Sequence, residues 1–261
     1  MKDENNNAGL RESAELKPRK TPLALRAREA FNRTCGIPIE ADLAPYHNAL
    51  SAIHAFRKDA GLDDIPDEGL ARMFHDLGTR PGRAESARKT RSRDRRMRSG
   101  IPGCENAVDS RLVIETFGLV FEAASRALGL ITHDAQLIAG LAMCGPRVAE
   151  LPTGEGKTLA AVFPACLSVL AGRGIHILTF NDYLARRDAA WMGPVYRLLG
   201  LSVGFIQEGM DNPAKRRAYA CDVTYATAKE AGFDFLRDQL VYDAADRVHR
   251  PFQMAIVDEA D

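Results

Sequence analysis

The stretch Leu151-Pro152-Thr153-Gly154-Glu155-Gly156-Lys157-Thr158 decides how the rest of the chain is interpreted, because it follows a short apolar run and precedes a long helical pattern. Its two glycines allow the backbone to turn so that successive N–H groups point inward toward an anion. The N-terminus of the following helix adds its positive end beneath bound phosphates. In such a loop Lys157 reaches the β- and γ-phosphates, and the Thr158 hydroxyl binds Mg²⁺. The stretch therefore predicts a site for Mg²⁺-ATP formed by Thr153, Gly154, Glu155, Gly156, Lys157 and Thr158.

A second stretch, at the far end of the chain, supports the first. Met254 to Val257 is an apolar run typical of a buried parallel strand, and Asp258-Glu259-Ala260-Asp261 follows it. Ligands of open α/β sheets bind at the carboxyl ends of the strands. Asp258 is then placed to hold Mg²⁺ through its water shell, and Glu259 to orient or deprotonate the water that attacks the γ-phosphate. We therefore expect Glu259 and Lys157 to be the catalytic residues.

Composition excludes several classes of protein. The chain has 261 residues, 46% of them hydrophobic, which is enough for a sizeable core. Lys plus Arg and Asp plus Glu number 35 each, so no global charge indicates a nucleic acid or a membrane as partner. The five cysteines are scattered without a C-x-x-C pair, as expected in a reducing cytosol. With no signal-peptide pattern and no run of 18 apolar residues, the sequence predicts a cytoplasmic protein that does not span a membrane.

The N-terminal part has a different character from the rest. Residues 1–22 are polar and charged, which predicts a flexible tail. Residues 23–110 carry apolar residues at helical spacing, which predicts a helical extension. Within this extension, residues 80–98 form a basic linker that could contact RNA phosphates or anionic lipid head groups. A solvated connecting segment is the simpler interpretation of this run, because no aromatic residue is interleaved for stacking on bases.

The core domain is expected over residues 111–261. A helical pattern runs from Leu112 to Leu128 and ends at Gly129. Thr132 or Asp134 can cap the next helix, whose first turn carries Gln136. The amide of Gln136 has a donor and an acceptor and so suits the edges of adenine, although a surface glutamine would look the same in sequence.

After the glycine-rich loop, strands and helices alternate. The apolar helix 158–170 is followed by a buried strand at 175–180, and Asn181 caps a helix that runs to about Leu199. Further strands are expected at 203–206, 222–225 and 254–257. This alternation predicts an α/β fold in which a parallel sheet is covered by helices on both faces.

Three stretches closely resemble SecA, the preprotein-translocase motor ATPase. They are TGEGKTL at 153–159, TFNDYLARRD at 179–188, and TYAT at 224–227 followed by GFDFLRD at 232–238. The resemblance is strong from about Ile114 to Asp261 and weaker over 65–77. It implies an α/β, RecA-like P-loop NTPase domain that is preceded by the helical N-terminal extension. In this resemblance Gln136 corresponds to the adenine-sensing glutamine, and Asp258 and Glu259 to the Mg²⁺ and water site.

The resemblance also implies partners. They are a membrane protein-conducting channel and unfolded preproteins, with possible contact to anionic lipid at the inner face of the cell membrane. The family continues beyond the point that matches Asp261 into a preprotein-binding insertion and a second RecA-like domain with arginine fingers. We therefore expect the sequence to describe the first half of a motor and to hydrolyse ATP slowly by itself.

Two alternatives remain open in the sequence. SecA usually has Met and a basic residue where this chain has Leu151-Pro152, and the Leu-Pro form is common in DEAD-type nucleic-acid helicases. The strict phosphate-loop pattern also has Gly at the position of Leu151. A helicase fragment is therefore one alternative, although nucleic acid is the less favoured partner. A nucleotide-binding module that no longer hydrolyses ATP is the other.

Overall fold

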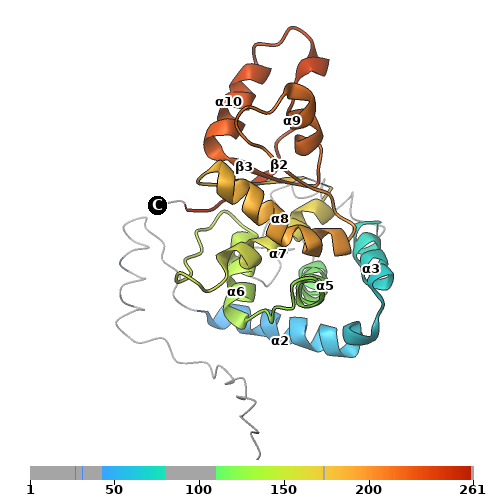
Figure 1. The fold of residues 1–261 in the computed structure, drawn as a ribbon. Coiled ribbons are helices and arrows are strands. Elements are labelled where there is room, and N and C mark those ends of the chain that lie inside the picture. Colours follow the sequence, from blue (N-terminus) through green and yellow to red (C-terminus); the bar gives the residue numbers. More distant parts are fainter. Residues whose placement is uncertain (1–26, 28–30, 32–42, 80–109, 173, 260–261) are drawn as a thin grey trace, which may run out of the picture. The chain divides into compact units, whose positions relative to one another are not determined.

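The computed structural model describes Ala27, Phe31 and residues 43–79, 110–172 and 174–259 (Figure 1). The expected tail at 1–22 and the basic linker at 80–98 lie outside these residues. Described residues from Pro45 onward belong to one compact unit. Its elements, in chain order, are α2 (Ala44–Asp59), η1 (Leu62–Asp64), α3 (Asp67–Thr79), α5 (Ser110–Leu128), α6 (Asp134–Met143), α7 (Lys157–Leu170), β1 (Ile175–Thr179), α8 (Asp182–Leu198), β2 (Val203–Phe205), α9 (Asn212–Tyr219), β3 (Val223–Thr227), α10 (Ala228–Asp238), η2 (Ala244–Asp246) and β4 (Met254–Val257).

The strands form one parallel sheet in the order β2-β3-β1-β4. Its register pairs Ile175 of β1 with Val223 of β3 on one side and with Met254 of β4 on the other. Helix α8 packs against β1, β2 and β3, and α7 packs against β1 and β4, whereas α9 packs on β2 and β3 and α10 on β3. Because crossovers between parallel strands are right-handed, α8 covers one face and α9 and α10 the other. Helix α7 packs against α8 and so lies on the face that α8 covers. The predicted α/β fold with a parallel sheet is confirmed.

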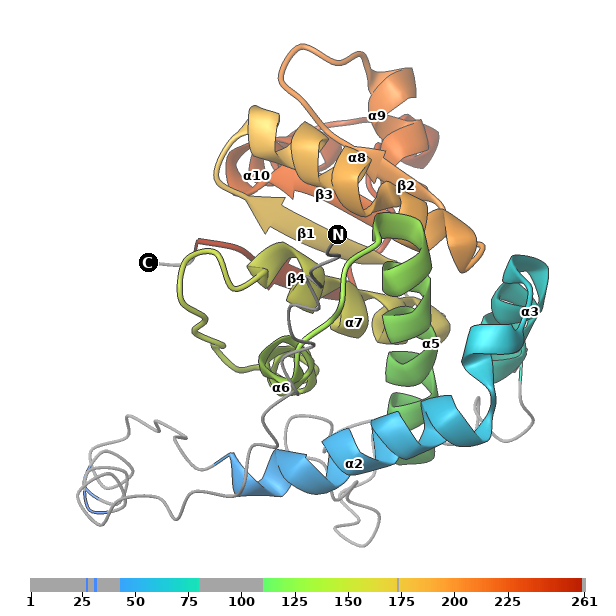
Figure 2. The ribbon, with the colours of Figure 1, turned by 60° about the horizontal axis from the view of Figure 1, so that its bottom comes forward.

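The larger core lies on the face covered by α7 and α8. Helices α5, α3 and α2 extend this core away from the sheet (Figure 2). The ring of Phe117 on α5 packs against that of Phe163 on α7 with centroids 5.2 Å apart, and Gly118 leaves space for the ring of Phe56 on α2. The helices of the N-terminal extension therefore share a core with the α/β part of the chain, and the domain boundary at residue 110 stays a prediction.

The opposite face carries a smaller core that contains Ile206, Ala218, Tyr219, Ala226 and Val248. Lys215 of α9 is buried, and its ammonium donates to Glu230 at 3.2 Å and to Asp234 at 2.7 Å on α10. This charged link ties the two helices of this face together.

Strand β4 departs from the prediction that all strands are buried. Only Ile256 is buried, and the side chain of Val257 is 53% exposed. Ile256 points into the larger core, whereas its neighbours along the strand point to the opposite face, where α9 and α10 pack on β2 and β3. The prediction of a sheet covered on both faces is therefore wrong at β4.

The sequence predicts where α5 and β1 end and where α8 begins, and the structure shows each of these three positions. Helix α5 ends before Gly129, whose φ of +65° is the left-handed conformation expected of a C-terminal glycine. Strand β1 ends at Thr179, and the side chain of Phe180 is exposed rather than buried as expected. Asn181 caps α8 as predicted, because its side chain accepts a hydrogen bond from the Leu184 N–H. Within the described ranges, no helix is both long and apolar enough to cross a membrane.

Candidate nucleotide-binding site

The glycine-rich loop enters α7 through two residues in the left-handed region. Gly154 has φ +89° and Gly156, the N-cap of α7, has φ +80°. Between them the Glu155 N–H donates to the Pro152 carbonyl at 3.2 Å, which closes the turn. Only glycine adopts these backbone angles without strain. The loop therefore presents the first N–H groups of α7, which have no acceptor inside the helix, to an anion.

The side chains of this loop are accessible. Thr153, Glu155 and Lys157 are exposed, and Thr158 is half-buried at the start of α7. Among the described residues Lys157 has no carboxylate partner, so its ammonium is available to a ligand. A lysine beside free backbone N–H groups at a helix N-terminus has the chemistry of a phosphate site.

Gln136 lies directly against the loop. Its Nε2 donates to the Glu155 carbonyl at 3.0 Å, and its Oε1 accepts from the backbone N–H of His133 at 3.0 Å. The N-cap of α6 is therefore His133, and the prediction of Thr132 or Asp134 as the cap is wrong. Helices α6 and α7 pack together, so Gln136 joins the base of α6 to the loop before α7.

Gly156 is the point of closest approach between these two elements. A Cβ atom at Gly156 would overlap the Gln136 amide. Gln136 is only 7% exposed, and its hydrogen bond to the Glu155 carbonyl holds the amide against the loop. Both polar atoms of the amide already have protein partners, which the sequence did not indicate.

The acidic residues follow β4 at the carboxyl edge of the sheet. The Asp258 N–H donates to the Leu178 carbonyl of β1 at 2.8 Å, and Asp258 Oδ1 accepts from the Glu259 N–H at 3.0 Å. Glu259 has φ +56°. Figures 1 and 2 show the end of β4 and the glycine-rich loop on the same side of the sheet. Within the described residues no hydrogen bond joins the two, so they share an edge rather than a direct contact.

Asp188 is a buried carboxylate near this edge for which the sequence motifs predict no role. It lies on α8, its carboxylate is 2% exposed, and its Oδ1 accepts from Arg187 Nε at 2.8 Å and Nη2 at 2.7 Å. Burial raises the pKa of Asp188, Arg187 opposes that rise, and the negative charge of Asp258 adds to it. Asp188 is therefore electrostatically coupled to the end of β4. The only sequence signal was its position as the last residue of the stretch at 179–188.

The donor set at this edge fits a hard divalent cation. The Thr158 hydroxyl and the Asp258 carboxylate supply oxygen ligands, which Mg²⁺ prefers together with water and phosphate oxygens. One Asp258 oxygen accepts from the Glu259 N–H, and within the described residues no hydrogen bond engages the other.

Comparison with known proteins gives one consistent result. A family model described as the SecA DEAD-like domain matches residues 34–261. A protein translocase subunit SecA of Synechococcus sp. (strain CC9902) is 48% identical over 226 residues, which are 87% of this chain and 22% of that protein. The protein of the same name from Acidiphilium cryptum (strain JF-5) is 53% identical over 151 residues, 58% of this chain and 17% of that protein. The chain thus spans about one fifth of the length of these relatives.

Proposed function

Because the chain belongs to the SecA DEAD-like domain family, we propose that it binds Mg²⁺-ATP and forms the first RecA-like domain of a motor. In this proposal the whole motor couples ATP hydrolysis to protein translocation across a membrane. The observation that carries it is the accessible loop 153–158 at the N-terminus of α7, on the sheet edge where Asp258 and Glu259 follow β4. Backbone N–H groups that can bind phosphate, a lysine and two carboxylates at one edge of the sheet are the parts that phosphoryl transfer requires.

Each residue of the site has a chemical task in this proposal. The N–H groups that begin α7 and the Lys157 ammonium bind the phosphate oxygens and orient them. Thr158 and Asp258 hold Mg²⁺, which supplies neutralisation of phosphate charge when it is bound. Glu259 orients the attacking water and accepts its proton.

Gln136 is proposed to contact adenine. Both atoms of its amide have protein partners, so a base would have to share these hydrogen bonds or replace them. Base contact and loop conformation would then be coupled through one side chain.

The partners and the location of the chain follow the family. We propose that the whole motor acts on unfolded preproteins at a membrane channel, on the cytoplasmic side of the membrane. The basic run at 80–98 could contact anionic lipid there, a proposal that rests on its charge alone. A nucleic-acid helicase is disfavoured, because the family model and the relatives that match this chain are of the SecA type.

The test of catalysis is phosphate release from ATP by the chain and by its Glu259→Gln variant. We expect slow turnover by the chain alone, because the arginine finger that the family resemblance assigns to a second domain is worth about 10³–10⁵ in rate. Adding a protein that carries the second RecA-like domain of a SecA relative should accelerate release, and Glu259→Gln should abolish that gain. Rapid turnover by the chain alone would contradict this expectation. Absence of any gain with the second domain would favour a module that binds nucleotide without hydrolysing it.

A further inference from the structure

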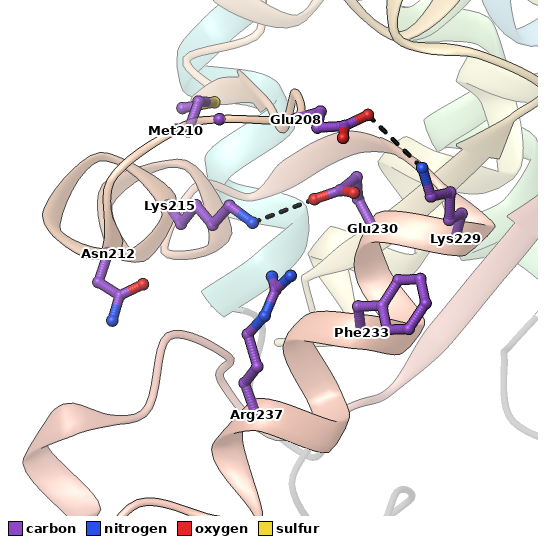
Figure 3. Close-up of a pocket in the computed structure, with 9 residues that line it drawn as sticks. Glu208, Met210, Asn212, Lys215, Lys229, Glu230, Phe233 and Arg237 are labelled. Carbon is purple, nitrogen blue, oxygen red and sulfur yellow. Dashed lines mark hydrogen bonds and ion pairs between the residues drawn. The ribbon is translucent and has the colours of Figure 1, made fainter.

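A groove of about 400 Å³ lies between the loop after β2 and helix α10 (Figure 3). It is on the face of the sheet that carries α9 and α10, and none of its lining residues belongs to the glycine-rich loop or to the end of β4. The proposed nucleotide chemistry therefore does not use it.

One wall of the groove is a single stripe of α10. Lys229, Phe233 and Arg237 are spaced four residues apart and so share one face of the helix. Figure 3 shows the two cationic side chains on either side of the Phe233 ring. The Phe233 side chain is 46% exposed, and the Arg237 guanidinium lies 6.0 Å from its ring centroid. The groove thus offers an aromatic surface between two cations.

The two cations of the stripe are incompletely paired. Arg237 donates through Nη1 to Asp234 at 2.7 Å, and among the described residues its Nε and Nη2 groups have no acceptor. Lys229 lies 3.5 Å from Glu208, a long contact between two exposed side chains. Such contacts are weak, and a ligand can displace them. The buried Lys215, by contrast, forms ion pairs with both Glu230 and Asp234.

The charges that line the groove restrict which chemical class of ligand can bind there. Lys215, Lys229 and Arg237 line the groove together with Glu208 and Glu230, and the buried Asp234 pairs with Lys215 and Arg237. A polyphosphate or a nucleic-acid strand would meet Glu208 and Glu230 as well as the cations, and nucleic-acid grooves need an excess of positive charge. A single carboxylate can instead take the Nε and Nη2 donors of Arg237, which have no acceptor among the described residues. Its neighbouring apolar group would rest on Phe233 and Met210.

We propose that this groove binds a peptide segment of a protein partner that carries an aspartate or glutamate next to an aromatic residue. The carboxylate forms charge-assisted hydrogen bonds with Arg237, which are about twice as strong as neutral ones. The aromatic side chain packs on the exposed ring of Phe233, with the edge-to-face or offset geometry that aromatic pairs prefer. Binding at this groove is separate from nucleotide binding at the loop 153–158.

The test is a titration of the isotope-labelled full chain, followed by backbone amide chemical shifts, with the dipeptide N-acetyl-Asp-Phe-amide. Two matched probes, N-acetyl-Asn-Phe-amide and N-acetyl-Asp-Ala-amide, each lack one of the two recognised groups. We expect the first dipeptide to bind with roughly millimolar affinity and to shift amides of α10 and of the loop 208–212. Each matched probe should bind about tenfold more weakly, because the first loses the charge-assisted hydrogen bonds to Arg237 and the second loses the aromatic contact with Phe233.

Variants of the chain separate recognition from folding. Phe233→Ala, which removes the aromatic contact, and Arg237→Gln, which removes the charged donors, should each weaken binding about tenfold. Arg237→Lys should restore part of the loss. Asp234 keeps Lys215 and Tyr219 as donors in the Arg237 variants, so the fold should survive. Tyr242→Ala, at a fully exposed residue outside the groove, and Lys157→Ala should leave binding unchanged. Equal affinity for the three dipeptides, insensitivity to Phe233→Ala, or binding of oligothymidylate in preference to the peptide would overturn the proposal.

Discussion

The side-chain amide of Gln136 donates a 3.0 Å hydrogen bond to the backbone carbonyl of Glu155, at the centre of the glycine-rich loop. The other end of the same amide accepts from the His133 N–H, so the side chain bridges the start of α6 and the loop before α7. These two residues are 19 positions apart in sequence. A side chain proposed to read the base thus also holds the loop that is proposed to bind the phosphates.

Replacing Gln136 tests this bridge. We expect Gln136→Ala to weaken nucleotide binding about tenfold, because the loop loses a donor and adenine loses its partner. Gln136→Glu is the matched variant, because it keeps the acceptor for His133 and loses the donor to Glu155. In isothermal titration calorimetry, the wild type should bind ADP more tightly than either variant does. Wild-type affinity in Gln136→Glu would show that the bond to Glu155 has no role in binding.

The second prediction compares the effect on stability of alanine at Gly156 with that of alanine at Gly154. Both have positive φ, so alanine is strained at either position by about 1–2 kcal/mol. Only at Gly156 would the new Cβ atom overlap the Gln136 amide, whereas nothing lies within 4 Å of the corresponding position at Gly154. Gly156→Ala should therefore lower the free energy of unfolding more than Gly154→Ala does. Urea denaturation of the two variants measures the difference, and equal losses would contradict the tight packing of Gln136 on Gly156.

The buried His176 predicts a pH dependence of stability. Burial, aided by the charge of Arg250, lowers its pKa from the ordinary 6.5 to about 4. The unfolded chain then binds more protons than the folded chain between these two values, so stability is full above pH 6.5 and falls as the pH decreases toward 4. The difference between the two pKa values corresponds to roughly 3 kcal/mol.

The measurement is the difference in free energy of unfolding between wild type and His176→Phe across this pH range. The ring of His176 lies among those of Tyr219, His249 and Phe252, so phenylalanine should fit. The free energy of unfolding of the variant should rise relative to that of the wild type as the pH falls. His75→Ala, at an exposed histidine, is the control that removes an imidazole without altering the buried cluster. A difference that does not change between pH 7 and 4 would refute the assignment.

Much of the fold could be predicted because it depends on patterns among residues that are close together in sequence. Apolar runs and the cap at Asn181 define the β1–α8 unit, and the glycines define the loop before α7. The exposure of Val257 could not be predicted, because hydropathy shows that a strand is apolar and not which of its faces a helix covers. The burial of Lys215 was hidden for a similar reason. It lies in the polar helix α9, and its carboxylate partners come from α10, past an intervening strand.

The sequence motifs propose the residues of the candidate site, which stay a prediction, and they do not indicate the contacts that these residues make. The motif indicates that Lys157, Thr158 and Asp258 act together, because their chemistry is tied to fixed positions relative to a strand and a helix. The bridge from Gln136 to Glu155 and the coupling of Asp188 to Asp258 depend on how α6, α7 and α8 pack. No periodic pattern in the sequence encodes that packing.

The central claim is that the loop 153–158 binds a nucleotide, and a titration of N-methylanthraniloyl-ADP with Mg²⁺ into the full chain tests it most directly. The Lys157 ammonium is exposed and faces no carboxylate among the described residues, so Lys157→Ala should remove a phosphate contact without harming the fold. We expect saturable binding by the wild type and by the control Lys229→Ala, and an affinity about 10- to 100-fold lower in Lys157→Ala. Equal affinity of Lys157→Ala and wild type, or no saturable binding by either, would contradict the account.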